Sequence, residues 1–90
     1  MVPAIWEALD VKIATLKFEA GDIRVVFDTG EVLSVPLDLF PELAKAGVDQ
    51  RAGWTLIGRG IGVHWESPDL DISVENFLAA HSRAHLLQYA

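Results

Sequence analysis

The sequence predicts an α+β fold, in which an antiparallel sheet begun by a three-stranded meander is followed by short middle helices and a C-terminal helix packed on the sheet. Three observations support this prediction. Residues 11–18, 23–27 and 31–37 largely alternate between apolar and polar side chains, which is the period of a half-buried strand. Each connection between these segments contains a glycine, which adopts the positive φ of a tight turn without a Cβ clash. After Ser73, apolar residues recur at the helical spacings of three and four.

The meander has two predicted turns and one predicted irregularity. Residues 19–22 form the first turn, and residues 28–30 form a three-residue hairpin loop in which Gly30 supplies the left-handed position. In the first strand the apolar positions shift by one residue near Thr15 and Leu16, which indicates a β-bulge.

The middle of the chain is predicted to hold short elements. Pro41 fits the first turn of a helix, because its missing N–H is not needed there, and Asp38 is placed to cap that helix. Pro68 then breaks regular structure and leaves an Asp-rich turn before the final helix, which Ser73 is expected to cap. The other expected elements are helical segments over residues 41–46 and 48–52 and strands over residues 54–57 and 61–65.

The charge of the chain argues against nucleic acid and anionic membranes as direct partners. The formal net charge is −6, and the seven Lys and Arg residues are scattered along the chain. Binding to phosphate groups needs a Lys/Arg surface, because neutralising the phosphates and releasing their counterions drives the association. The 51% hydrophobic content is high for a soluble domain, so some apolar surface is expected to remain exposed for a protein partner or a second copy.

The cysteine content and the N-terminal segment predict the compartment. The chain has no cysteine, which excludes disulfides, thiolate catalysis and zinc–thiolate sites and fits a reducing cytoplasm. Residues 1–6 lack a basic region, and no apolar run is long enough for a signal peptide or for the ~20 residues of a membrane span. We therefore expect a single cytoplasmic domain over residues 1–90.

Several short motifs occur in a fixed order along the chain. They are Asp28-Thr-Gly-Glu31, Val35-Pro-Leu37, Pro41-Glu-Leu43, Asp49-Gln-Arg51, Trp54-Thr-Leu-Ile-Gly58 and Ile61-Gly-Val-His-Trp65. In these motifs, over roughly residues 10–79, the chain resembles the bacterial family called domain of unknown function 2442 (DUF2442). It departs at three positions, where Glu66, Pro68 and Leu70 stand for the proline, leucine and glutamate of the family pattern.

The resemblance implies a small α+β domain with no assigned activity. Some members of the family carry a helix-turn-helix domain after this one, which this chain is expected to lack. Others are similar to one half of a two-gene pair that is suspected of toxin–antitoxin behaviour. The resemblance therefore implies a protein partner, and the product of the neighbouring gene is the first one to test.

One group of residues suggests chemistry. His64, Asp69 and Asp71 are candidates for an acid/base or metal-binding cluster, because histidine titrates near neutrality and serves as a base or a ligand. No third ligand stands at a motif spacing, and carboxylates before a helix commonly accept backbone N–H bonds. In a strand Trp65 points opposite to His64, so we expect one of the two in the core and the other at the surface.

Two motifs are incomplete matches to enzyme sites. Residues 28–30, with residues 56–59 later, are similar to the signatures of retroviral-type aspartic proteases, which are dimers that share a proton between two aspartates. The interval between them is too short for a flap, and Glu31 is charged where the protease has a small apolar residue. The glycine-rich residues 58–62 lack the Lys-Ser/Thr and the following helix of a phosphate loop.

The last helix carries His81 and His85 at a spacing that can bind zinc. The metalloprotease motif needs a glutamate directly after the first histidine, and Ser82 stands there instead. A partly exposed end of the helix is the simpler interpretation.

Together these observations predict a non-enzymatic protein-interaction module, with the antitoxin-like half of a two-gene module as one form of it. No catalytic residue, metal ligand or cofactor is assigned. The alternatives are a small-ligand or metal-sensing regulatory domain and a dimeric hydrolase of the aspartic-protease type, and a homodimer is compatible with all three. Aromatic anchors flanked by polar groups dominate interface energetics. On that basis the candidate interaction surface is the last helix together with His64, Trp65, Glu66, Asp69 and Asp71.

Overall fold

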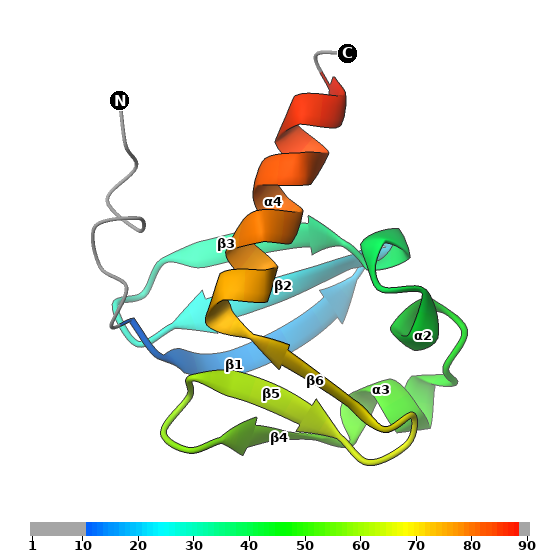
Figure 1. Ribbon diagram of the computed structural model, residues 1–90. Coiled ribbons are helices and arrows are strands. Elements are labelled where there is room, and N and C mark those ends of the chain that lie inside the picture. Colours follow the sequence, from blue (N-terminus) through cyan, green and yellow to red (C-terminus); the bar gives the residue numbers. More distant parts are fainter. Residues whose placement is uncertain (1–10, 89–90) are drawn as a thin grey trace.

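The computed structural model describes residues 11–88, with side chains up to residue 84, and shows two three-stranded antiparallel sheets. The α+β fold class is confirmed, and the strands are divided between two sheets that Figure 1 shows as two layers. The first sheet has the order β1 (Ile13–Glu19), β2 (Asp22–Phe27), β3 (Val32–Pro36). The second has the order β4 (Trp54–Ile57), β5 (Gly62–Trp65), β6 (Leu70–Ser73).

Helical segments connect and cover the sheets. The helix α4 (Val74–Gln88) follows β6 directly, contacts β3 and rises beyond both sheets in Figure 1. Within residues 11–88 no helix is long and apolar enough to cross a lipid bilayer. The segments between the two sheets are η1 (Leu37–Leu39), α2 (Pro41–Ala44) and α3 (Val48–Ala52).

The meander agrees with the sequence pattern in both of its special features. Gly30 has a φ of 91°, and its N–H donates to the carbonyl of Phe27 at 2.9 Å, as expected for the hairpin loop. The bulge is present one residue earlier than predicted, because Ile13 pairs with Phe27 whereas Thr15 already pairs with Val26. The extra residue brings both Ile13 and Leu16, three positions apart, onto the buried face.

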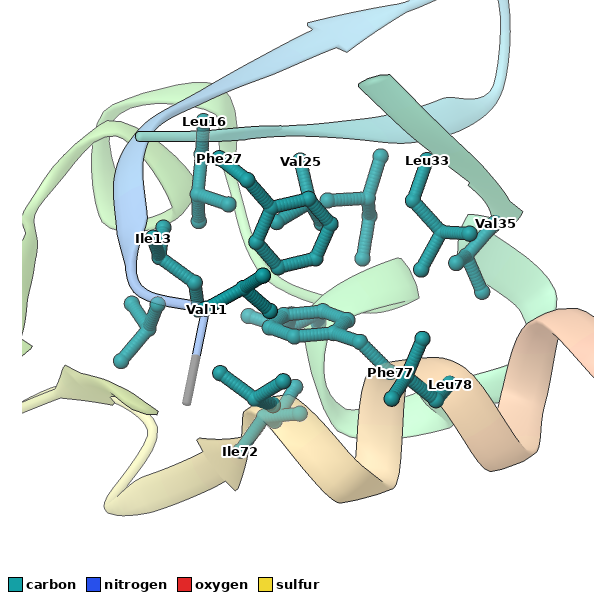
Figure 2. Packing of buried hydrophobic residues seen from close by; sticks show 14 of the residues in the cluster. Val11, Ile13, Leu16, Val25, Phe27, Leu33, Val35, Ile72, Phe77 and Leu78 are labelled. Atoms are coloured by element: carbon teal, nitrogen blue, oxygen red, sulfur yellow. The ribbon is translucent and has the colours of Figure 1, made fainter. Parts of the chain in front are cut away.

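The core lies between the two sheets and α4. Figure 2 shows side chains of the first sheet directed toward Ile72 of β6 and toward Phe77 and Leu78 of α4. The largest fully buried side chains are Trp65, Phe27 and Phe77. Phe77 also packs edge-on against the ring of Phe40, with 5.7 Å between the ring centroids. Buried apolar residues from β1, β2, β3, α2, β5, β6 and α4 therefore form one core.

A close approach of the backbone joins the two sheets. The N–H of Ile13 in β1 donates to the carbonyl of Gly60 at 2.8 Å, and a Cβ on Gly60 would lie 2.5 Å from the oxygen of Ile13. The next residue, Ile61, accepts a bond from the N–H of Val74 at 3.0 Å. The glycine-rich turn of residues 58–61 thus links β1 to the start of α4.

Two local predictions were wrong. Asp38 does not cap α2, because Phe40 holds the N-cap position and no side chain bonds there. The segment predicted as an Asp-rich turn is partly a strand, since Leu70–Ser73 pairs with β5 as β6. Pairing partners five to eleven residues back in the chain, and not the local Pro and Asp content, determine this strand. Ser73 does cap α4: its Oγ accepts from the N–H of Asn76 at 3.1 Å.

Candidate functional site

The candidate site is centred on His64, on the outward face of the second sheet. Strand alternation places Val63 and Trp65 in the core and His64 on the opposite face. Across the sheet His64 pairs with Asp71 of β6 on one side and with Thr55 of β4 on the other. These three residues form one row over three strands.

His64 and Asp71 are in direct contact. The imidazole Nδ1 lies 2.5 Å from Oδ1 of the carboxylate, a short hydrogen bond between neighbouring strands. The side chains are 32% and 65% exposed, respectively, so solvent reaches the pair. Because Nδ1 is engaged with the carboxylate, Nε2 is the ring nitrogen left for any other contact.

The charges around His64 favour its protonated form. The hydrogen bond to Asp71 raises the pKa of His64 above its ordinary value of 6.5. Partial burial opposes this effect, and the negative charges of Asp71, Asp69 and Glu66 reinforce it. Three neighbouring carboxylates therefore favour the protonated form of His64.

The two other carboxylates belong to the turn between β5 and β6. Glu66 directly follows β5 and Asp69 directly precedes β6, and the negative charge of each acts on His64. Both turn carboxylates are exposed, and neither has an ion-pair partner among the described residues. We call His64, Glu66, Asp69 and Asp71 the acidic face.

Trp65 is not part of this exposed surface, which corrects the sequence-based candidate set. Its side chain is 0% exposed, and its indole Nε1 donates to the backbone carbonyl of Arg51 at 3.0 Å. The expectation that one of His64 and Trp65 is buried and the other reaches the surface is confirmed. The tryptophan supports the face from beneath and contacts no solvent.

Sequence reasoning missed the residues of α3 that hold the turn between β5 and β6. Gln50 donates from Nε2 to Oγ of Ser67 at 3.1 Å, and its Oε1 accepts from the N–H of Gly47 at 3.0 Å. Arg51 donates from Nη1 to the carbonyl of Ala46 at 2.8 Å. The Asp49-Gln-Arg motif was the signal available in the sequence, but only the fold shows what it contacts.

The other motifs have contacts within the fold. The carboxylate of Asp28 accepts a bond from the backbone N–H of Lys12 at 3.3 Å, at the end of the first hairpin. His81 contacts the carbonyl of Ser34 through Nδ1 at 3.0 Å, which joins α4 to β3. The side chain of His85 lies outside the described residues. Within the described part of the chain, no three His, Asp or Glu side chains are placed to hold a metal ion.

Comparison with known proteins assigns the family. The family model described as protein of unknown function (DUF2442) matches residues 13–82. The chain belongs to the DUF2442 family. The match includes both strands that carry His64 and Asp71, α3 and the first half of α4.

A solved structure has the same fold as this DUF2442 protein. It is a protein of unknown function from Rhodospirillum rubrum, with 27% sequence identity and a TM-score of 0.66. The similarity covers 77% of this chain and 86% of that one. No curated protein matches this chain.

Proposed function

We propose that this DUF2442 protein is a non-enzymatic, cytoplasmic interaction module that binds a basic partner protein through the acidic face. The observation that carries the proposal is the exposure of Glu66 and Asp69 without an ion-pair partner in the described chain. Water solvates these exposed carboxylates in the unbound protein, and no ion pair within the described chain has to break before they contact Lys and Arg groups of another molecule. Complementary charge steers encounter and sets partner choice.

Exposed apolar side chains at β4 and in the turn after it offer additional contact area on the second sheet. Leu56 on β4 is 37% exposed, and Ile61 in the turn after β4 is 54% exposed. β4 is an edge strand of its sheet, so one side of its backbone has no neighbouring strand among the described residues. Leu56 pairs with the buried Val63, so it points to the sheet face opposite His64, and Ile61 lies at the other end of β5 from Glu66. The exposed edge of β4 is therefore a separate contact area that does not border the acidic face.

The partner that we propose is the protein encoded beside this one, in which case this chain is the acidic, antitoxin-like half of a two-gene module. This part of the proposal rests on the family resemblance and on the net charge of −6. Co-expression of the two genes with a tag on this chain tests it directly. We expect co-purification and relief of any growth inhibition that the neighbour causes when expressed alone.

Charge variants locate the contact. Glu66→Gln and Asp69→Asn are expected to weaken capture of the partner about 2–5-fold each at low salt, and less at high salt, because exposed ion pairs are screened. Asp38→Asn and Glu42→Gln make the same charge change at exposed positions on η1 and α2 and serve as controls. Equal effects of both pairs would show that net charge alone matters, and the acidic face would lose its role.

A second candidate function is a small-ligand or metal-sensing domain, which the His64–Asp71 pair favours because Nε2 of His64 is not used in that contact. A ligand that binds the native state raises its melting temperature by mass action. Thermal-shift screening with Zn²⁺, Ni²⁺, EDTA and a metabolite set separates the two candidates. An unchanged melting temperature throughout the screen eliminates the sensing function.

A further inference from the structure

We propose that His64 and Asp71 form a proton-dependent latch that closes the base of the turn between β5 and β6. The two side chains face each other at a cross-strand position, one residue inside the final pair of Trp65 with Leu70. Their contact therefore joins the two strands one pair below the turn, where it opposes separation of the strands that carry residues 66–69.

The rest of the turn is held by contacts that do not titrate. Ser67 accepts a hydrogen bond from the amide of Gln50, and both groups are neutral at all ordinary pH values. Beneath the turn, Trp65 donates to a backbone carbonyl of Arg51. The His64–Asp71 contact is thus the part of this arrangement whose strength depends on a proton.

All charged groups that act on His64 have the same sign. Asp71 acts from β6, and Glu66 and Asp69 act from the turn, while β4 presents the uncharged Thr55 opposite His64. A protonated imidazole offsets these carboxylates and donates to one of them. A neutral imidazole leaves three negative charges close together at the two ends of one short turn.

The direction of the switch follows from these charges. The imidazolium is favoured in the folded protein, so the latch is closed while His64 is protonated. It weakens as the pH rises through the His64 pKa, which lies above 6.5 in the folded state. The turn is then expected to open locally more often, while the core and the first sheet stay folded. This device is intrinsic to the chain, and it stands whether or not the acidic face binds a partner.

Nuclear magnetic resonance tests the latch on the intact chain. The His64 imidazole and the backbone amides are followed from about pH 5.5 to about pH 8.5, on both sides of the ordinary histidine pKa. Amide exchange is corrected for its intrinsic pH dependence and expressed as protection. We expect protection of the β6 amides to fall several-fold as His64 loses its proton, while protection of the β2 amides stays constant.

Variants separate the latch from a general effect of charge. Asp71→Asn is expected to lower the pKa of His64 and to remove the pH-dependent fall in β6 protection, which we call the step. His64→Gln is expected to remove the step as well. Asp69→Asn deletes one negative charge without touching the hydrogen bond, and His81→Gln removes a histidine on α4; both should keep the step. A flat protection profile in the wild type, or a step that persists in His64→Gln, would overturn the proposal.

Discussion

The indole of Trp65 and the backbone carbonyl of Arg51 are joined by a hydrogen bond of 3.0 Å, which ties the buried face of the second sheet to the last turn of α3. The same arginine donates through its guanidinium to the carbonyl of Ala46, beyond the end of α2. One residue thus connects the core tryptophan to both short helices. These contacts hold β5, the strand that carries His64, against α3.

Replacement of Trp65 by phenylalanine should destabilise the protein more than the lost side-chain volume alone would, because the indole N–H is also removed. In Trp65→Phe the partly buried carbonyl of Arg51 loses its partner and the core loses the volume of the indole, so we expect a decrease of about 2–4 kcal/mol in the free energy of unfolding. Urea denaturation measures it. The matched control is Trp54→Phe, at the half-buried residue that pairs with Trp65 across the sheet, where we expect about 1 kcal/mol or less. Similar losses in both variants would contradict the structural role of the Trp65–Arg51 bond.

Gly60 should tolerate no side chain, because of space as well as conformation. Its φ is 105°, and a Cβ would meet the backbone of Ile13 at 2.5 Å. We expect Gly60→Ala to lower the free energy of unfolding by about 2–5 kcal/mol. Gly21→Ala is the control, since Gly21 also has a positive φ of 82° but has nothing within 4 Å of the added Cβ. A loss of about 1–2 kcal/mol there isolates the conformational part, and a Gly60 variant no worse than this control would argue against the close approach.

The start of α4 should depend on a reciprocal cap. The N–H of Asn76 donates to Oγ of Ser73 at 3.1 Å, and the N–H of Ser73 donates to Oδ1 of Asn76 at 3.2 Å. Ser73→Ala is expected to cost about 0.5–2 kcal/mol of stability, and the double variant with Asn76→Ala less than the sum of the single ones. Ser82→Ala, in the interior of the same helix, is expected to change stability by less than about 0.5 kcal/mol. Strict additivity of the two cap variants in thermal or urea unfolding would show that the two bonds act independently.

The thermal stability of the whole domain should carry a small pH dependence from His64. Its folded pKa is raised, so its stabilising contribution is complete below the unfolded value of 6.5 and is lost as the pH rises through the higher folded value. The pair is exposed, so we expect a melting-temperature difference of a few degrees at most between wild type and Asp71→Asn at low pH, disappearing at high pH. Calorimetry of both proteins from about pH 5.5 to about pH 8.5, on both sides of the ordinary histidine pKa, measures the difference in melting temperature. A gap between the two proteins that widens as the pH rises would reverse the predicted sign.

Local sequence signals predicted the elements that depend on neighbouring residues. The strand over 54–57 and the helical turn over 48–52 have the predicted bounds, and Gly30 adopts the left-handed conformation that the hairpin loop requires. The cap at Ser73 was predictable for the same reason, because its hydroxyl bonds an amide only three residues away. Each of these features is decided within a few residues of chain, where conformational preference and side-chain chemistry act directly.

The candidate site was predictable only in part. His64, Asp69 and Asp71 were recognisable as a group that combines a titratable ring with carboxylates. Their arrangement was not, because the Pro and Asp content around Asp71 is typical of a turn. Pairing with β5 makes that segment a strand, and it brings Oδ1 of Asp71 to 2.5 Å from Nδ1 of His64.

The sequence by itself determined the α+β class, the meander, the acidic charge and the capped final helix, since each follows from periodicity, composition or short-range bonds. The tertiary structure alone decided three things: that the strands form two sheets, that Trp65 lies in the core while His64 faces outward, and that α3 holds the turn above them. These depend on contacts between segments far apart in the chain. Strand alternation required that His64 and Trp65 face opposite ways, but only the position of the core determines which of the two is buried.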